Sequence, residues 1–410
     1  MRIFLSVGEP SGDVHGANLV RELRTLDPNI ECVGFGGPRM QQSGCQLIAD
    51  LTKLAVMFIW SVIKNYRTFK RYLNQADTYF RNNCVDAVVL IDYPGFNWLV
   101  ARRAKKYGIP VFYYGVPQMW AWAPWRVKKL KRLVDHVLCK LPFEPDWFRD
   151  RGVKAEFVGH PFYDELANQK LDRQFCSQMR EKAEKILLLL PGSRDSEVAR
   201  NWPILRDAAH HVSQQVPGVA VVVGAFCDEH KAAIERQLSD EGHALQVFVG
   251  RTPELMSVAD CAIACSGSVS LELMYHKLPT VIVYRVSRLK FFVQHFLIRA
   301  RFITLVNLMA SESIERTGRT AYDPDAVGAE TVPMPEYLTS HDCAVSVGQR
   351  ISRWLTADEE RLASRNWLSQ LKDRFAHPGA TGRAGRLILD TLKSGQQTPD
   401  ELERRSRQVA

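Results

Sequence analysis

The sequence of 410 residues predicts an α/β protein made of two doubly wound, Rossmann-like domains that face a cleft. Short runs rich in β-branched and aromatic residues recur along the chain, and most are too continuously apolar for a sheet with one wet face. The segments between them, such as HGANLVRELRTL and NWLVARRAKKYG, have helical spacing. Alternation of these two patterns is typical of a parallel sheet covered by helices on both faces.

The expected strands form two series separated by a polar stretch. The first series is RIFLSVG, DAVVLIDYPG, IPVFYYGV, HVLCKLPF and KAEFVGHP, and the second is ILLLLPG, VAVVVGAF, LQVFVG, CAIACSG and PTVIVYRV. Residues 164–184 between them are polar and helical in pattern, and the strands restart at Ile186. We therefore expect an N-terminal domain over residues 1–183 and a C-terminal domain over 184–375. A helix near 376–393 is a candidate to pack back on the first domain, and the polar tail 394–410 is expected to be disordered.

The composition argues against a membrane-spanning or metal-binding protein. The apolar runs fall short of the ~18 residues that a spanning helix needs, and the N-terminus runs into a strand pattern without a small-residue cleavage site. We expect a cytoplasmic protein. The nine cysteines are scattered, with no Cys-x-x-Cys pair or His cluster, and Cys84, Cys139 and Cys261 lie in runs that look like core strands. Reduced cysteines that pack in the core are therefore expected, rather than a zinc site.

Two strand-to-helix junctions in the second half have the design of an anion site. In LLLLPGSRDSEV and CAIACSGSVSLELM an apolar run stops at a small-residue turn and a helical pattern follows, which aims backbone N–H groups at one point. Two such turns suggest a nucleotide ligand. The candidate donor-binding residues are Gly192, Ser193, Arg194, Ser266, Gly267, Ser268 and Glu272.

Polar side chains in the first half also follow expected strands, where open α/β sheets bind ligands. GEPSGDVHGANL carries Ser11, Asp13 and His15, although it could equally be an ordinary strand-to-helix turn. In LIDYPGFNWLVA, Asp92 is either a helix cap or a general base at the mouth of the sheet. We favour the base, because Asn97 and His160 also arrive at strand ends.

An aromatic cluster and two apolar–basic regions remain. WAWAPW, which contains Trp122, precedes RVKKLKRL and favours an interface or sugar contact over helix packing or base stacking. LAVMFIWSVI at 54–63 suits a membrane-surface wedge, with a buried helix as the equal alternative, and residues 288–302 have the same character. The net charge of +9 allows an anionic membrane, a phosphorylated substrate or nucleic acid as partner. The candidate membrane residues are Val56, Met57, Phe58, Ile59, Trp60, Lys64 and Arg67.

These motifs together resemble the lipid-A-disaccharide synthases, inverting glycosyltransferases of the GT-B class. The resemblance runs through GEPSGDVHGA, GFGGPRM, IDYPGFN, LPFEPDWF, FVGHP, LLPGSR and SGSVSLE, over roughly residues 1–306, and resumes weakly at HPGATGRAG. It implies transfer of 2,3-diacylglucosamine from UDP-2,3-diacylglucosamine to 2,3-diacylglucosamine 1-phosphate, giving the β-1,6-linked disaccharide and UDP in the cleft between the domains.

The same resemblance implies roles for particular residues. Asp92 and Arg194 would be the catalytic pair, Glu272 would hold the nucleotide ribose, and Asn307 would lie among the donor contacts. The acceptor or cleft side would hold Ser11, Asp13, His15, Asn97, Trp122 and His160. No metal or cofactor is implied, and the enzyme would dock on the cytoplasmic face of the inner membrane.

The chain departs from the family pattern in three places. Phe58 stands where the family usually has glycine, Ser268 replaces a threonine, and residues 311–331 look like an insertion that replaces a Gly-Arg-Glu segment. Two rival functions are a UDP-sugar 2-epimerase and a non-catalytic nucleotide-sugar or membrane-surface binding protein; nucleic-acid binding ranks last. The acyl-chain length and the oligomeric state are left open, and a homodimer is among the states allowed.

Overall fold

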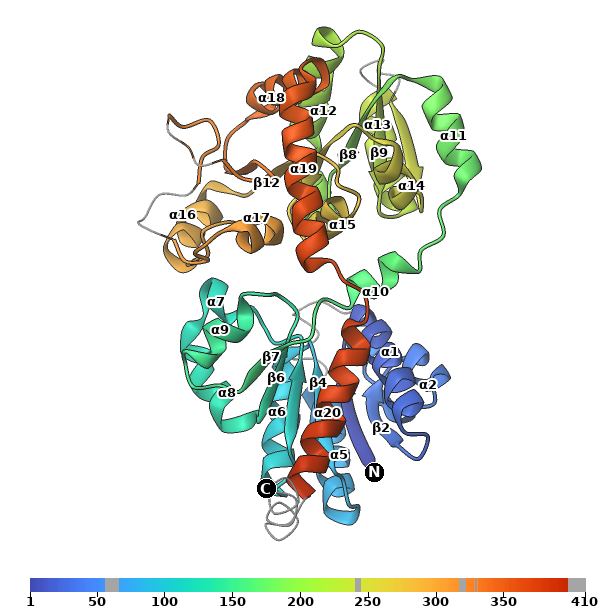
Figure 1. Ribbon diagram of the computed structural model, residues 1–410, viewed down its shortest axis with the longest axis vertical. Helices are drawn as coiled ribbons and strands as arrows, with labels where there is room; N and C mark the ends of the chain where they lie inside the picture. The colour runs from blue at the N-terminus through green and yellow to red at the C-terminus, as the bar shows by residue number, and fades with distance from the viewer. Residues whose placement is uncertain (56–65, 240–244, 317–321, 328, 330, 397–410) are drawn as a thin grey trace, which may run out of the picture. The chain divides into compact units, whose positions relative to one another are not determined.

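The computed structural model describes residues 1–55, 66–239, 245–316, 322–327, 329 and 331–396. By its internal contacts the chain forms two compact units, one made of 1–119, 123–167 and 377–410, the other of 120–122 and 168–376. Each unit has a parallel sheet with helices around it (Figure 1). The predicted fold class, α/β with two parallel-sheet domains, is confirmed.

The sheet of the first unit has the order β3-β2-β1-β4-β5-β6-β7, and all its neighbouring strands are parallel. The strands are β1 (Arg2–Val7), β2 (Glu31–Gly36), β3 (Gln46–Asp50), β4 (Ala87–Ile91), β5 (Val111–Tyr114), β6 (His136–Cys139) and β7 (Ala155–Phe157). The order reverses beside β1, and α/β sheets bind ligands outside the carboxyl ends of strands at such a switch point.

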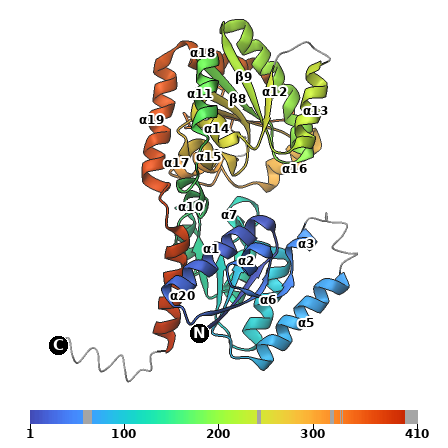
Figure 2. The same cartoon turned by 90° about the vertical axis from the view of Figure 1, so that its right-hand side faces the viewer.

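Both faces of this sheet are buried, which explains its continuously apolar strands. Ile3 and Leu5 of β1 pack in a core with helices α1 (Pro10–Leu26) and α20 (Ala380–Gln396). Phe4 packs instead against Phe80 of α5 (Tyr66–Asn82). Figure 2 shows α20 lying along α1, so the C-terminal helix completes the core of the first unit.

The remaining helices of the first unit are short connections, except α6. They are α2 (Pro38–Gln42), α3 (Thr52–Ala55), α6 (Pro94–Lys106), α8 (Val127–Leu133), α9 (Glu144–Arg149) and α10 (Phe162–Ala167). The short helix α7 (Met119–Trp122) and the 3-10 turn Pro124–Arg126 carry the tryptophan cluster.

The sheet of the second unit has the order β10-β9-β8-β11-β12-β13 and is also parallel. Its strands are β8 (Lys185–Leu190), β9 (Val219–Ala225), β10 (Gln246–Val249), β11 (Cys261–Cys265), β12 (Thr280–Arg285) and β13 (Glu336–Thr339). Its helices are α11 (Arg173–Lys182), α12 (Asp195–Gln215), α13 (Asp228–Ser239), α14 (Thr252–Val258), α15 (Val269–Tyr275), α16 (Arg288–Leu297), α17 (Leu305–Ala310), α18 (Ala344–Thr356) and α19 (Asp358–Phe375).

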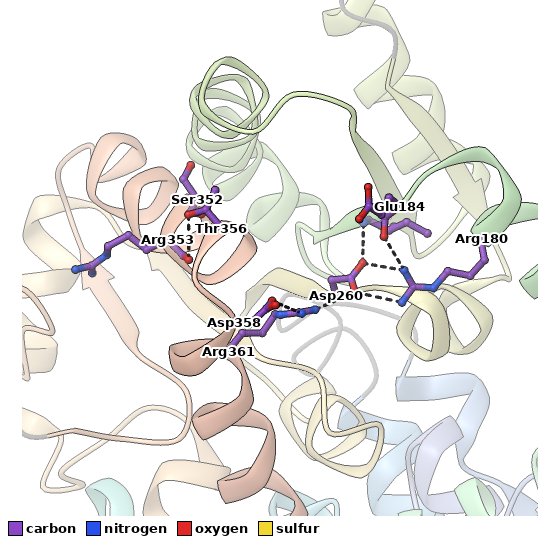
Figure 3. Close-up of polar contacts among 9 residues, drawn as sticks. Arg180, Glu184, Asp260, Ser352, Arg353, Thr356, Asp358 and Arg361 are labelled. Atoms are coloured by element: carbon purple, nitrogen blue, oxygen red, sulfur yellow. Dashed lines mark hydrogen bonds and ion pairs between the residues drawn. The ribbon is translucent and has the colours of Figure 1, made fainter.

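Asp260 fastens two helices to this second sheet. Its carboxylate accepts hydrogen bonds from Arg180 of α11, from Arg361 of α19 and from the backbone N–H of Ile186 in β8 (Figure 3). Helix α11 therefore belongs to the second unit, and the chain passes from the first unit to the second after Ala167. The boundary expected from the sequence lies later, after residue 183, because the pause in the strand series ends there.

Every strand expected from the sequence is present, but β2, β3 and β13 were missed. ECVGFG contains glycines, QLIAD lies at the sheet edge with mixed polarity, and EYLT is short, so none has a long apolar run. The expectation for Cys84 was wrong, since this thiol is exposed and lies outside any strand.

Two features of the described residues concern the expected membrane and metal properties. No helix there is long and apolar enough to cross a membrane. The same residues contain no group of three or more His, Cys, Asp or Glu side chains arranged to hold a metal ion. Of the predicted tail 394–410, residues 394–396 are the end of α20, and the others lie outside the described residues.

Candidate functional site

Three residues follow neighbouring strands at the carboxyl edge of the first sheet. Asp92 comes directly after β4, Gly115 after β5 and Lys140 after β6. Because the strands are parallel and adjacent, the three positions lie side by side at one edge. Lys140 Nζ lies 3.0 Å from Asp92 Oδ1, across the position of Gly115.

The backbone at Asp92 has an unusual conformation. Asp92 and Tyr93 have φ values of 45° and 41°, in the left-handed region that costs most residues roughly 1–2 kcal/mol. The Asp92 carbonyl accepts hydrogen bonds of 2.8 Å from both Tyr113 Oη and Asn97 Nδ2. The backbone N–H of Asp92 donates to the Tyr114 carbonyl. These bonds hold the strained turn in place, and strain of this kind is concentrated at functional sites. Asp92 does not cap α6, whose N-cap is Tyr93.

Two histidines are kept neutral near this edge. Burial, reinforced by the positive charge of Lys140, lowers the pKa of His15 to about 4. The same two causes lower the pKa of His160 well below its usual value. His15 Nδ1 lies 3.6 Å from Glu165 Oε1, and burial raises the pKa of that carboxyl. Neutral imidazoles can both donate and accept hydrogen bonds, as contacts to sugar hydroxyls require.

Other predicted residues of the first unit have structural contacts. Asp13 is buried and accepts hydrogen bonds from the backbone N–H groups of Gly37, Arg39 and Met40, so it caps α2. The fully buried Asn97 donates to carbonyls of Ser6, Ile91 and Asp92, and its Oδ1 accepts from Ser6 Oγ. Both side chains shape the sheet edge.

The remaining predictions on the acceptor side are surface or loop positions. Ser11 is exposed in the first turn of α1, and the side chain of Trp122 is 43% exposed at the end of α7. His160 follows β7, and its Nδ1 accepts from the backbone N–H of Phe162.

In the second unit, the turn after β8 places Arg194 at the N-terminus of α12. Gly192 has φ 133°, and a Cβ there would approach the Cβ of Glu197 to 2.7 Å, so the turn needs glycine. Glu197 accepts hydrogen bonds from the backbone N–H groups of Ser193 and Arg194 and pairs with the Arg194 guanidinium. The Arg194 side chain is 76% exposed, so the guanidinium remains accessible to a ligand.

Asn201, which no sequence motif indicated, connects the turn after β8 with the turn after β11. Asn201 is buried in α12, donates to the Pro191 carbonyl and to Cys265 Sγ, and accepts from the backbone N–H of Arg285. It thereby ties together the ends of β8, β11 and β12. Its place one helical turn beyond Glu197, on the buried face, is the signal that could have found it.

The second turn follows β11 and leads into α15. Ser266 Oγ donates to the Ile303 carbonyl, Gly267 has open space around its Cα, and Ser268 is the N-cap of α15 without a side-chain capping bond. Glu272, one turn into α15, has its pKa raised to about 7 by burial. A partly buried carboxylate at this place is suited to accept hydrogen bonds from a diol.

Asn307 has the contacts of a structural residue. It is buried in α17, donates to the Met334 carbonyl and to Glu336, and accepts from the Met334 backbone N–H. Burial raises the pKa of Glu336 to about 7, and this carboxyl also accepts from the N–H groups of Ile303 and Thr304. The two side chains therefore join β13 to the segment before α17.

Of the candidate membrane residues, only Arg67 is described, and it is exposed on α5. The other region of that character, α16, exposes Leu289 by 75% and Phe292 by 63% beside the exposed Arg288 and Lys290. The others, Val56, Met57, Phe58, Ile59, Trp60 and Lys64, lie outside the described residues.

Comparison with known proteins gives one family. Residues 3–325 match the family model described as lipid-A-disaccharide synthetase. The lipid-A-disaccharide synthase of Trichlorobacter lovleyi is 34% identical over 403 residues, covering 96% of this chain and 98% of that protein. The corresponding synthase of Geobacter sulfurreducens is 32% identical over 392 residues, with 95% and 97% covered.

Among solved structures, the chain is similar to the UDP-GlcNAc 2-epimerase of Neisseria meningitidis bound to UDP-GlcNAc. The TM-score is 0.59 at 13% sequence identity, and the match covers 96% of this chain and 100% of that one. At this identity the likeness shows the fold.

Proposed function

The chain belongs to the lipid-A-disaccharide synthase family, and from this membership we propose how its residues carry out the glycosyl transfer. The activity is that of a glycosyltransferase acting on a UDP-sugar and a lipid acceptor. The proposed reaction moves 2,3-diacylglucosamine from its UDP donor to 2,3-diacylglucosamine 1-phosphate, with inversion at the anomeric carbon. Its products are the β-1,6-linked disaccharide and UDP.

Asp92 is the proposed general base. Its carboxylate accepts the proton of the acceptor hydroxyl as that oxygen forms a bond to the anomeric carbon and the bond to UDP breaks. The observation that carries this assignment is the strained turn at the end of β4, held by Tyr113 and Asn97. The side-chain carboxylate itself makes none of these backbone-fixing contacts, so its role is not that of a cap.

The donor is proposed to bind at the two turns of the second unit. The exposed guanidinium of Arg194 would contact the diphosphate and stabilise the charge that UDP gains as it leaves. The open turn at Gly267 allows close approach of a phosphate to the backbone, and Glu272 would accept from the ribose hydroxyls. Gly192, Ser193, Ser266 and Ser268 shape the same turns. Asn307 donates to Glu336, which accepts from the Ile303 N–H, and the Ile303 carbonyl accepts from Ser266.

The neutral side chains of the first unit are proposed to contact the acceptor. His15 and His160 would exchange hydrogen bonds with sugar hydroxyls, while Asp13 and Asn97 maintain the sheet edge. Ser11 and Trp122 are exposed positions at which the acceptor sugar would be contacted.

Peripheral docking on an anionic membrane is also proposed, because a substrate with acyl chains must be drawn partly from a bilayer. Support comes from the sequence of 54–63, from exposed Arg67, and from exposed Leu289 and Phe292 on α16. Apolar side chains beside basic ones are suited to the interface of such a membrane. A homodimer is compatible with this arrangement.

The test combines an activity assay with one variant. Purified protein incubated in detergent with UDP-2,3-diacylglucosamine and the monosaccharide 1-phosphate should release disaccharide and UDP. Asp92→Asn, which keeps the shape but cannot take the proton, should lower turnover by about 10²–10⁴-fold and leave UDP affinity nearly unchanged.

Two results would contradict the proposed role of Asp92 or the proposed enzymatic function. Unchanged turnover in Asp92→Asn would reduce this residue to a structural role. Absence of disaccharide from the parent protein, with UDP still bound, would favour the non-catalytic binding protein. Epimerisation of the donor is the third readout, although the likeness to the 2-epimerase is accounted for by the shared fold.

A further inference from the structure

Lys140, which no motif singled out, contacts the side chain of the proposed base. Its Nζ lies 3.0 Å from Asp92 Oδ1, and the two side chains are 20% and 27% exposed. This contact is both an ion pair and a hydrogen bond that Lys140 Nζ donates to the carboxylate oxygen. A partly buried pair of this length is screened less by solvent than a surface ion pair.

The ion pair between Lys140 and Asp92 requires a glycine at position 115, which lies between them. Gly115 follows the strand between β4 and β6, and a Cβ there would lie 2.5 Å from Lys140 Nζ and 2.8 Å from Asp92 Oδ1. Gly115 also has φ 72°, which favours glycine. The backbone therefore leaves room for the ammonium and carboxylate groups to meet over β5.

The titratable groups around the pair leave Lys140 as its positive partner. His15 from α1 and His160 after β7 are neutral at pH 7, since burial and Lys140 lower their pKa values. The acidic Asp164 on α10 accepts from the N–H groups of Ala380 and Thr381, and Glu165 lies beside His15. The Asp92 charge also acts on the buried Tyr113 and Tyr114, on which Glu9 and Arg383 act as well.

We propose that Lys140 is a positioning residue for the glycosyl transfer: its ammonium group fixes the Asp92 carboxylate in the one rotamer in which it takes the proton of the acceptor hydroxyl. This inference rests on the proposed role of Asp92 as base. A general base must lie within hydrogen-bond reach of the proton that it takes, and a charge-assisted hydrogen bond holds its carboxylate in one orientation.

The test removes the charge while preserving the length of the side chain. Lys140→Met should lower kcat by about 10- to 100-fold, a smaller loss than for Asp92→Asn, because the base remains but is less well placed. The KM for the acceptor should stay unchanged, because Lys140 is proposed to contact the base and not the acceptor. Lys140→Arg should restore most of kcat, and UDP affinity in both variants should equal that of the parent.

A matched control is available at the opposite edge of the same sheet. Lys105 forms an ion pair of 2.7 Å with Asp135, which precedes β6. Lys105→Met removes a similar pair and should leave both kcat and the acceptor KM unchanged. Lys140→Gln gives a second uncharged variant if Lys140→Met does not fold, and thermal melts identify that case.

The possible outcomes separate the two proposals. An unchanged kcat in folded Lys140→Met or Lys140→Gln overturns the positioning role. A higher acceptor KM also overturns it, because Lys140 would then bind the acceptor phosphate. If Asp92→Asn itself keeps full turnover, the proposed base has failed, and Lys140 loses its role with it.

Discussion

Asp92, the proposed base, is a residue whose sequence context and structural contacts point to different roles. The sequence shows an aspartate before a Pro-Gly turn, which is equally typical of a helix cap. The structure removes the cap interpretation, since Tyr93 is the N-cap of α6 and Asp92 contacts Lys140. One observation against the helix cap is therefore the contact with Lys140, which lies 48 positions away in the sequence.

Arg194 provides the first prediction at the residue scale. Arg194→Ala should weaken UDP binding by roughly 10- to 100-fold, since each charge-assisted hydrogen bond contributes about 1.5–3 kcal/mol. Turnover should fall as well, because the same group stabilises departing UDP. Titration calorimetry measures the affinity, and Arg236→Ala, on exposed α13 of the same unit, is the control. Equal UDP affinity in Arg194→Ala and the parent would show that the phosphate site was wrongly assigned.

Glu272 provides a prediction about pH. Burial raises its pKa to about 7, so the carboxyl is largely protonated below that pH. Ribose hydroxyls donate best to the ionised form, and UDP affinity should therefore rise as pH increases through 7 and then level off. The measurement is UDP affinity between pH 5.5 and 8.5 in the parent and in Glu272→Gln.

The comparison with Glu272→Gln isolates this carboxyl. The phosphate of UDP and the buried Glu336, whose pKa is also about 7, titrate in both proteins and cancel. Parallel affinity curves for the two proteins would mean that Glu272 does not contact the nucleotide.

At the scale of elements, α20 connects the end of the chain to the beginning. Asp164 accepts a hydrogen bond from the backbone N–H of Ala380 at the N-terminus of α20. Ala384, Ile388 and Leu389 of α20 lie in the core formed with β1 and α1. From the sequence this helix was a candidate to pack back on the first domain, and the structure adds which elements it contacts there, namely α1 and the core around β1.

The packing of α20 leads to a stability prediction. Ile388 is fully buried, so Ile388→Ala should lower the free energy of unfolding of the first unit by about 2–5 kcal/mol through lost burial and a cavity. Chemical denaturation followed by tryptophan fluorescence measures this change, and exposed Lys393→Ala is the control. A loss below about 0.5 kcal/mol, the usual range for surface changes, would contradict the packing.

At the scale of the whole molecule, the net charge of +9 and the exposed apolar side chains lead to a prediction about membranes. Leu289→Ser combined with Phe292→Glu should reduce co-sedimentation with anionic vesicles while UDP affinity is kept. Binding by the parent should fall with ionic strength but not vanish, because salt weakens only the electrostatic part. Leu362→Ser, an exposed leucine on α19, is the control. Equal binding by the double variant and the parent would exclude α16 from the docking surface.

The apolar run 54–63 calls for a parallel experiment. Phe58→Ser combined with Ile59→Glu should lower vesicle binding and activity on long-chain substrate. If that variant instead loses its cooperative unfolding transition, the buried-helix alternative is correct.

The sequence alone determined the two parallel sheets, the strands with long apolar runs, the small-residue turns and the family. Strands buried on both faces must be continuously apolar, and a backbone that turns at Gly192 requires glycine, so both features are written locally. Only the tertiary structure decided the contacts of Asp13, Asn97 and Asn307 and the ion pair of Lys140. These depend on which strands and helices become neighbours, and a contact between residues far apart in the chain leaves no periodic signal in the sequence.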